Sequence, residues 1–445
     1  MDAVRWPWCA DARTLALFRC GLGLSVACDV VDRARDLDLY VDGGPVDLAE
    51  LKSILGWSPT LLLSTNPAIV ALFMCVAAMA GVALAAGWRT RAATVVCIVT
   101  VTSLQSRLPL VYFGGDALLI ALLWLSLLMT LHARWSVDSG WDRRPLVVSS
   151  PAVLVVVMQA VVLHAGSVFF KLESAEWRGG GAVTPLLLSH IHPSPLGQWV
   201  GLHAPPMMAP FAAVSLGVEA AAVLLLVPHR RLRLLVGGML IAMQLGMALL
   251  LEAGLFQLFA IVVILGAMPL PWARADDVET VVETSRLRRT LAIVCVVLLP
   301  LTNTLNVFTD VVGNQAPLLG TMGLNQSWRM YSHPKEVAQG YFYVVAVRSD
   351  GVLVDLWNGT VAPAGQRPAA PFSTYASFRV RRLWEWLLFP PARPFLGGVA
   401  RWQCRRAQAQ LGDVAEVRAW FVDEGGDPHV ATLFEQRCAT GLPDR

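Results

Sequence analysis

The chain of 445 residues has few charged side chains for its length. They make up 15% of it, whereas a soluble domain carries about 25%. Too few charges are present to cover a water-facing surface, and eight cysteines are too few for a disulfide-dense secreted fold. The 35 basic and 32 acidic side chains nearly balance, so no nucleic-acid partner is expected. Hydrophobic residues reach 56%, with a mean hydropathy of +0.56, which predicts a multi-spanning membrane protein.

Apolar stretches long enough to cross a bilayer, roughly 20 residues each, recur along the first two thirds of the chain. Nine of them lie near residues 13–31, 67–87, 92–110, 112–132, 151–171, 209–228, 232–250, 254–271 and 289–310. The expected fold is an all-α multi-pass membrane helix bundle of about nine spans over residues 1–310. An extramembrane α+β domain is expected over residues 311–445.

Basic residues in the loops predict the orientation of the bundle. The loops on the side of the N-terminus hold twelve: Arg89, Arg91, Arg134, Arg143, Arg144, Arg230, Arg231, Arg233, Arg274, Arg286, Arg288 and Arg289. The opposite loops hold six: Arg33, Arg35, Lys52, Arg107, Lys171 and Arg178. Because cytoplasmic loops are enriched in arginine and lysine, we expect a cytoplasmic N-terminus and a periplasmic or ER-lumenal C-terminal domain.

The C-terminal region predicts a small sheet with helices. Two β-prone runs, 340–348 and 352–357, flank a Ser-Asp-Gly turn and predict a hairpin. Residues 373–410 are expected to be mostly helical, either resting on the bilayer surface or packed on the domain. Further strands are expected at 414–421 and 429–434.

Cys404 and Cys438 are disulfide candidates in this region, because the expected compartment is oxidising, although sequence alone does not give connectivity.

Ionisable residues inside or beside the apolar stretches are functional candidates, because each is costly to insert. They are Arg19, Asp29, Asp116, Lys171, Glu219 and Glu252. Arg19 is expected to join helices by pairing with Asp29 or Asp116. Glu252 is expected to be solvated in a turn, and Glu219 needs a partner, for which His164 is available.

Lys171 closes the fifth stretch and has two interpretations. It can snorkel, with its ammonium group among the lipid headgroups. Alternatively, it lies in an apolar pocket where desolvation favours the neutral amine, which acts as a base. Phe169, Phe170 and Trp177 could wall such a pocket and hold a flat ring. No cluster of histidine and cysteine has the spacing of a zinc site, and no metal is expected.

Several short motifs, in their order along the chain, resemble the horizontally transferred transmembrane (HTTM) domain family, which includes vitamin K-dependent gamma-carboxylases. The motifs are Leu15-Ala-Leu-Phe-Arg19, Gly21-Leu-Gly23, Asp29, Arg33, Tyr40-Val-Asp-Gly43, Trp135-Ser-Val-Asp138, Lys171-Leu172 with Trp177 and Gly179, Glu219, Gly254-Leu-Phe256, and Trp328-Arg-Met330 with His333. The resemblance covers most of the chain.

The resemblance implies that Lys171 deprotonates reduced vitamin K or another quinol, whose reaction with oxygen yields the base for glutamate carboxylation. Arg19, Asp29, Asp116, Glu219 and Gln244 are implied as structural or orienting groups. Two positions depart from the carboxylase pattern: Phe113-Gly-Gly-Asp116 replaces an Asn-His pair, and Gln244 replaces a histidine.

Two functions therefore stay open. The first is a quinol-dependent carboxylase or oxygenase, whose partners are lipid, quinol and an extracytoplasmic protein or peptide substrate. The second is a catalytically inactive membrane protein that binds lipid or a partner. A transporter is disfavoured, because no paired Gly/Pro-broken helices occur in related halves.

Overall fold

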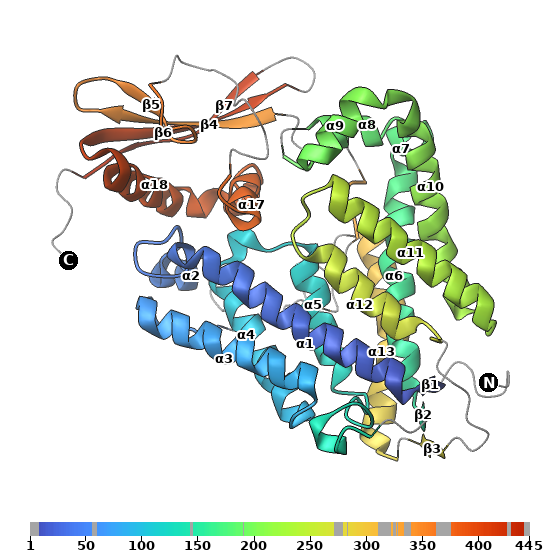
Figure 1. The fold of residues 1–445 in the computed structure, drawn as a ribbon. Coiled ribbons are helices and arrows are strands. Elements are labelled where there is room, and N and C mark those ends of the chain that lie inside the picture. Colours follow the sequence, from blue (N-terminus) through green and yellow to red (C-terminus); the bar gives the residue numbers. More distant parts are fainter. Residues whose placement is uncertain are drawn as a thin grey trace.

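The computed structural model describes residues 9–55, 60–142, 146–189, 191–270, 279–282, 284–309, 322–323, 326, 328–332, 340–361, 375–424 and 429–439. His333 of the family-like motif lies outside these residues. The described part is a helical bundle with a sheet-containing domain at one end (Figure 1).

A helix occupies each of the apolar stretches. These helices are α1 (Ala12–Arg35), α3 (Pro67–Ala86), α4 (Thr90–Arg107), α5 (Gly114–Ser126), α6 (Pro151–Glu173), α10 (Met208–Ala220) continued by η6 (Ala221–Leu226), α11 (Arg230–Leu250), α12 (Phe256–Ala267) and α13 (Arg286–Thr309). Within the described residues, five helices are long and apolar enough to cross a membrane: α1, α3, α6, residues 205–226 and α11. This is fewer than the nine spans predicted. The helices α5 and α12 have 13 and 12 residues, so they rise less than a bilayer of about 30 Å requires.

The five long helices divide into central and peripheral ones. In the most apolar windows of α1 and α6, 61% and 67% of the residues are buried. The corresponding shares are 33% in α3 and 28% in both residues 205–226 and α11, which expose large apolar side chains such as Leu72, Val214 and Leu249. Exposed apolar surface on this scale is typical of contact with lipid.

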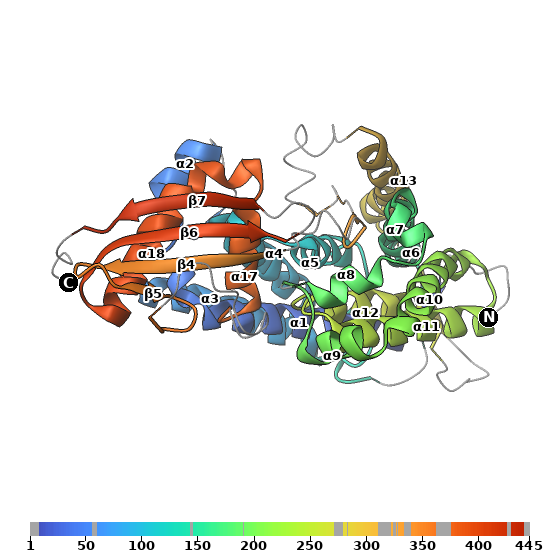
Figure 2. The same ribbon diagram turned by 90° about the horizontal axis from the view of Figure 1, so that it is seen from above.

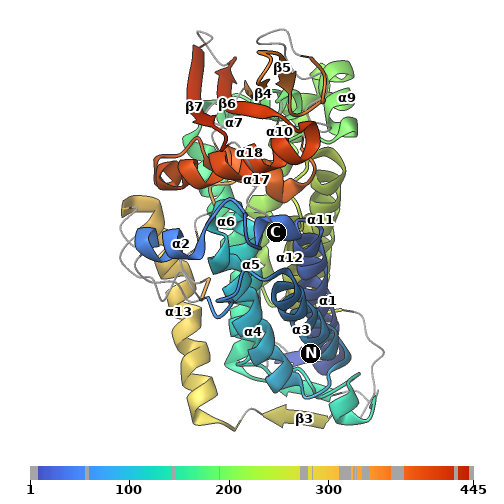
Figure 3. The ribbon, with the colours of Figure 1, turned by 90° about the vertical axis from the view of Figure 1, so that its left-hand side faces the viewer.

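A small sheet closes the end of the bundle that carries the N-terminus (Figures 1 and 3). Strand β1 (Cys9–Asp11) pairs antiparallel with β2 (Leu146–Ser149), and β2 pairs parallel with β3 (Glu279–Val282). This sheet was not predicted, because strands of three or four residues give too short a sequence pattern. It brings together three segments that are far apart in the chain.

The opposite end of the bundle carries four short helices and the C-terminal domain (Figures 1 and 2). The short helices are α2 (Leu48–Leu55), α7 (Ala175–Arg178), α8 (Val183–Leu188) and α9 (Pro195–His203). The loops between the bundle helices thus alternate between the two ends.

The C-terminal domain is built on an antiparallel sheet of order β5-β4-β6-β7. Its strands are β4 (Gly340–Arg348), β5 (Leu353–Asp355), β6 (Val414–Asp423) and β7 (His429–Arg437), which confirms the predicted hairpin and both later strands. The predicted helical region is divided into α17 (Phe378–Trp386), η7 (Pro390–Phe395) and α18 (Leu396–Leu411). Prolines 390, 391 and 394 explain the break.

Helix α17 is packed between the sheet and the bundle and does not rest on a bilayer surface. Trp384 is fully buried and contacts the rings of Phe342 and Trp357 in the domain. Arg379, on the same helix, enters the bundle. Elsewhere in the domain, Cys404 of α18 and Cys438 after β7 form a disulfide, with Cα atoms 5.5 Å apart.

Residues near 322–332 return to the bundle, although the sequence analysis assigned them to the tail. Gly323 has a φ of +63°, and a Cβ atom there would lie 2.5 Å from the carbonyl oxygen of Ala117 in α5. Only glycine therefore allows this approach. Trp328, five residues on, is buried beside Gly166 of α6.

Candidate functional site

Lys171 and Glu219 form a buried ion pair between α6 and α10. The Lys171 Nζ atom lies 2.8 Å from Oε1 and 2.7 Å from Oε2 of Glu219. Their side chains are 3% and 5% exposed. Ser167, one helical turn before Lys171, lies with its hydroxyl 3.3 Å from each carboxylate oxygen. Lys171 therefore does not snorkel, and its partner is Glu219 rather than a lipid headgroup.

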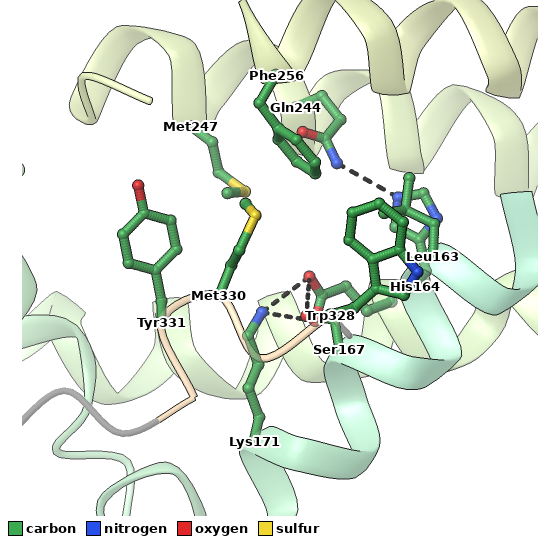
Figure 4. A pocket seen from close by; sticks show the side chains of 11 residues that line it. Leu163, His164, Ser167, Lys171, Gln244, Met247, Phe256, Trp328, Met330 and Tyr331 are labelled. Carbon is green, nitrogen blue, oxygen red and sulfur yellow. Dashed lines mark hydrogen bonds and ion pairs between the residues drawn. The ribbon is translucent and has the colours of Figure 1, made fainter. Parts of the chain in front are cut away.

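A cavity of about 20 Å³ adjoins this pair (Figure 4). It has space for about one water molecule. Its walls come from α6, α10, α11, α12 and the segment near 330; they are Leu163, His164, Ser167, Lys171, Glu219, Gln244, Met247, Phe256, Trp328, Met330 and Tyr331. Charged, amide and aromatic groups from five parts of the chain thus converge on one small space.

The aromatic lining differs from the one expected. Phe256, Trp328 and Tyr331 line the cavity, whereas Phe169 and Phe170 do not. Phe169 is 40% exposed, and Phe170 is buried. The Cζ atom of Arg329 lies 4.7 Å from the centre of the Phe170 ring.

Trp177 holds the site in a different way. The Lys171 Nζ atom lies 4.7 Å from the centre of its indole ring, a favourable cation–π position. The indole Nε1 of Trp177 donates a 2.7 Å hydrogen bond to the carbonyl oxygen of Tyr331. Trp177 thus joins the lysine to the segment that covers the cavity.

Gln244 and His164 form the opposite wall. The Gln244 Nε2 atom lies 3.3 Å from His164 Nε2, and His164 Nδ1 lies 2.8 Å from the carbonyl oxygen of Ala160. Within the described residues, the buried Gln244 Oε1 atom has no hydrogen-bond partner. His164 therefore pairs with Gln244 and not with Glu219, and an amide acceptor remains available at the cavity.

The expected ionisable residues Asp29 and Asp116 belong to a second cluster, away from Lys171. Arg33 donates to Asp29 at 2.8 Å and to Asp116 at 2.5 Å, and Arg379 of α17 donates to Asp29 at 2.5 Å. The four side chains are at most 1% exposed. Tyr40 accepts a further hydrogen bond from Arg33. This arginine–aspartate network connects the C-terminal domain to α1 and α5.

The expected pairing of Arg19 with Asp29 or Asp116 is wrong. Its guanidinium group donates instead to backbone carbonyl oxygens, among them those of Leu131 at 2.9 Å and Trp135 at 2.5 Å. Arg19 lies near the N-terminal end of α1, whereas Asp29 lies almost three turns further along. Arg19 therefore joins α1 to the loop after α5, and Arg33 takes the place predicted for it.

Met330 and Tyr331 cover the cavity and are called the cavity lid. A third polar cluster lies beside this lid. In it, the Arg381 Nε atom of α17 lies 3.2 Å from Glu385 Oε1. Arg381 also donates to the carbonyl oxygens of Ile191 and Glu252. Burial alone would raise the pKa of Glu385, but Arg381 and its neighbours hold that pKa below its usual range. Burial lowers the pKa of the nearby His192 to about 4.

The lid residue Tyr331 packs its ring 5.3 Å from that of His192, and burial raises the pKa of Tyr331 to about 12. The cavity lid therefore contacts the third cluster through two neutral rings.

The described residues contain no group of three or more histidine, cysteine, aspartate or glutamate side chains placed to hold a metal ion. Met247 and Tyr331 were not singled out from the sequence, since a lone apolar or aromatic residue gives no signal there. Phe256, Trp328 and Met330 were noted only within family-like motifs. Arg33 carried a usable signal, because it follows Asp29 by four residues on a helix.

No protein-family model, curated protein sequence or solved structure matches the chain.

Proposed function

We propose that the chain is a multi-pass membrane protein of the HTTM type, with nine spans, a cytoplasmic N-terminus and the C-terminal domain outside. The small sheet supports this topology. Four bundle helices separate β1 from β2 and four separate β2 from β3, so an even number of crossings returns the chain to the same side for each strand. Helix α13, after β3, makes the ninth crossing and leads to the other side. The basic residues of the loops favour the cytoplasm for that side. The Cys404–Cys438 disulfide favours an oxidising compartment for the other.

The proposed activity is proton abstraction from a quinol by the Lys171–Glu219 pair, in a carboxylase- or oxygenase-like reaction. The observation that carries it is a buried, overall uncharged acid–base pair beside a cavity with aromatic walls. Reduced vitamin K or a related quinol would supply a hydroxyl group and, once deprotonated, reactivity toward oxygen. The pair can take up that proton at Glu219 or at Lys171 and then carries a positive charge that stabilises the oxyanion.

The residue types around the cavity suit a hydroxylated ring. Phe256 and Trp328 offer flat apolar faces, and the unpaired Gln244 Oε1 atom can accept a hydrogen bond from a hydroxyl group. A space of about 20 Å³ is too small for the ring itself. Met247 and Met330 close it, and unbranched thioether side chains rearrange easily, so they are the residues we expect to move on binding.

The same small volume favours the second candidate, a non-catalytic HTTM-type protein. In that case the pair is closed by Ser167 and Trp177, and its role is to fix α6 to α10. A protein or peptide substrate belongs to the first proposal. Binding of lipid or of a partner protein is the role in the second.

Epoxide formation from a reduced naphthoquinone distinguishes the two functions. Purified protein in lipid nanodiscs is compared with Lys171→Met, Glu219→Gln and the control Lys52→Met, which changes an exposed lysine at the same end of the bundle. We expect epoxide from wild type and Lys52→Met, and a loss of at least about 100-fold in both site variants. Absence of epoxide from folded wild-type protein would overturn the enzymatic proposal.

A further inference from the structure

A second and larger cavity, of about 240 Å³, lies inside the C-terminal domain. One wall is formed by strand β4 and the turn after β5, and the other wall by helices α17 and α18. Its lining residues are Val344, Leu356, Trp357, Ala376, Val380, Gln403, Arg406, Ala407 and Gln410. The cavity is therefore enclosed by one domain and shares no residue with the Lys171 site.

Three polar side chains of α18, Gln403, Arg406 and the exposed Gln410, line this cavity, and the first two form no hydrogen bond or ion pair with a described residue. Gln403 is 5% exposed, and among the described residues its amide forms no hydrogen bond. The guanidinium group of Arg406 stacks on the ring of Trp402 at 4.8 Å and forms no hydrogen bond or ion pair with any described residue.

The neighbouring arginines of the helix show that partners are the rule on α18. Arg405 donates to the carbonyl oxygen of Gly43 at 2.6 Å, and Arg401 lies 3.5 Å from Glu50. Arg406 is half-buried and Gln403 is buried, and neither has a hydrogen-bond acceptor among the described residues, so both can donate to a molecule that enters the cavity.

Apart from Gln410, the rest of the described lining is largely apolar. Val344, Leu356, Val380 and Ala407 surround the space, and the Trp357 indole group donates its own hydrogen bond to the carbonyl oxygen of Phe342. The volume is below the roughly 300–1,000 Å³ of sites for drug-sized ligands. Among the described residues of the lining, Arg406 is the only cation, which suits one carboxylate better than a phosphate of higher charge.

We propose that this cavity binds a small carboxylate with a compact apolar body. The carboxylate pairs with the Arg406 guanidinium group and accepts a hydrogen bond from the Gln403 amide. The apolar body contacts Val380 and Ala407. This site is independent of the proposed quinol chemistry, because it lies in a different domain.

Titration calorimetry on the full chain in nanodiscs tests the proposal with phenylacetate and its uncharged analogue phenylacetamide. We expect saturable binding of phenylacetate with one site per chain, and at least about tenfold weaker binding of the amide. Empty nanodiscs give the partitioning background. Failure of phenylacetate to bind saturably, or equal affinity for the two compounds, would overturn the proposal.

Three variants separate recognition from folding. Arg406→Gln should weaken phenylacetate at least about tenfold and leave phenylacetamide unchanged. Ala407→Leu should fill the cavity and abolish binding of both compounds while the unfolding temperature is kept. Arg401→Gln, on the exposed side of the same helix, should change neither affinity. Wild-type phenylacetate affinity in folded Arg406→Gln or Ala407→Leu would also overturn the proposal.

Discussion

The bundle buries two groups of charges, and they are built differently. In the arginine–aspartate network, Asp29 binds two arginines and Arg33 binds two aspartates, all at most 1% exposed. In the Lys171–Glu219 pair, one cation meets one anion beside a cavity. The network connects two domains, whereas the pair connects two neighbouring helices.

The difference fits a structural role for the network and the proposed chemical role for the pair. A network in which each charge has two opposite partners fixes the helices that carry it, because removing one side chain leaves several buried charges uncompensated. A single pair beside a cavity can exchange a proton with a molecule that enters. The number of oppositely charged partners of each buried charge, rather than its burial alone, therefore indicates which buried charges are structural.

The largest effect is expected from opening the network. Arg379→Leu leaves Asp29 and Asp116 buried with one arginine between them, and should lower the free energy of unfolding by about 3–5 kcal/mol. Thermal unfolding and protease sensitivity of the C-terminal domain would report it. Arg401→Leu, at an exposed pair, serves as the control and should cost less than about 1 kcal/mol. Equal effects of the two variants would contradict the structural role of the network.

Removing one partner of the Lys171–Glu219 pair should lower the free energy of unfolding by nearly as much. Removing both partners should restore most of it. Lys171→Met or Glu219→Leu alone leaves an unpaired buried charge and should destabilise by about 3 kcal/mol. The double variant removes both charges and should regain most of that loss in thermal unfolding. Any quinol-dependent activity should stay lost in all three. Recovered activity in the double variant would exclude the pair as the base.

The third cluster should supply a pH response of the stability between pH 6.5 and 4. The folded pKa of His192 is about 4, below its ordinary 6.5, so the unfolded chain binds a proton first as the pH falls. Stability is therefore present above pH 6.5 and lost between 6.5 and 4, by the order of 1–3 kcal/mol. Glu385, whose pKa is lowered, adds a further loss below its unfolded value.

Unfolding temperatures of wild type and His192→Asn across this range measure the effect. The variant should show a shallower slope between pH 6.5 and 4, and an unchanged slope would show that His192 does not titrate in this way.

The smallest effect is expected at a helix end. Asp138 accepts hydrogen bonds from the backbone of Arg89 and Thr90, at 2.8 and 2.9 Å, at the start of α4. Asp138→Ala should cost about 1 kcal/mol. Asp138→Asn should keep most of this stability, because an amide oxygen also caps a helix. A loss in Asp138→Asn as large as in Asp138→Ala would show that charge, not capping, is what matters.

Elements that depend on residues close together in the chain could be predicted from the sequence. Continuous apolar runs predicted a helix at every expected place, and two β-prone runs, 340–348 and 352–357, around a glycine-containing turn predicted the hairpin. Lys171 and Glu219 were both singled out by the cost of inserting a charge. Their pairing was not, because 48 residues separate them and nothing in either stretch specifies its neighbour.

Long-range partners account for the remaining errors. Arg379 was expected on a helix that rests on the bilayer surface or packs on the domain, and its contact with Asp29 in the bundle, 350 residues away, was not predicted. The cavity walls include Trp328 and Tyr331 from a segment whose return to the bundle depends on Gly323. Glycine at one position is too weak a signal to predict such a return.

The small sheet at the N-terminal end has a consequence for biosynthesis. Strand β1 leaves the ribosome first, but β2 follows it by 135 residues and β3 by 268, counted from Asp11 to Leu146 and to Glu279. At about 5–20 residues per second, the whole sheet forms roughly 15 s to a minute after β1 is made. A substitution in Cys9–Asp11 would thus disturb a late stage of bundle assembly rather than the first.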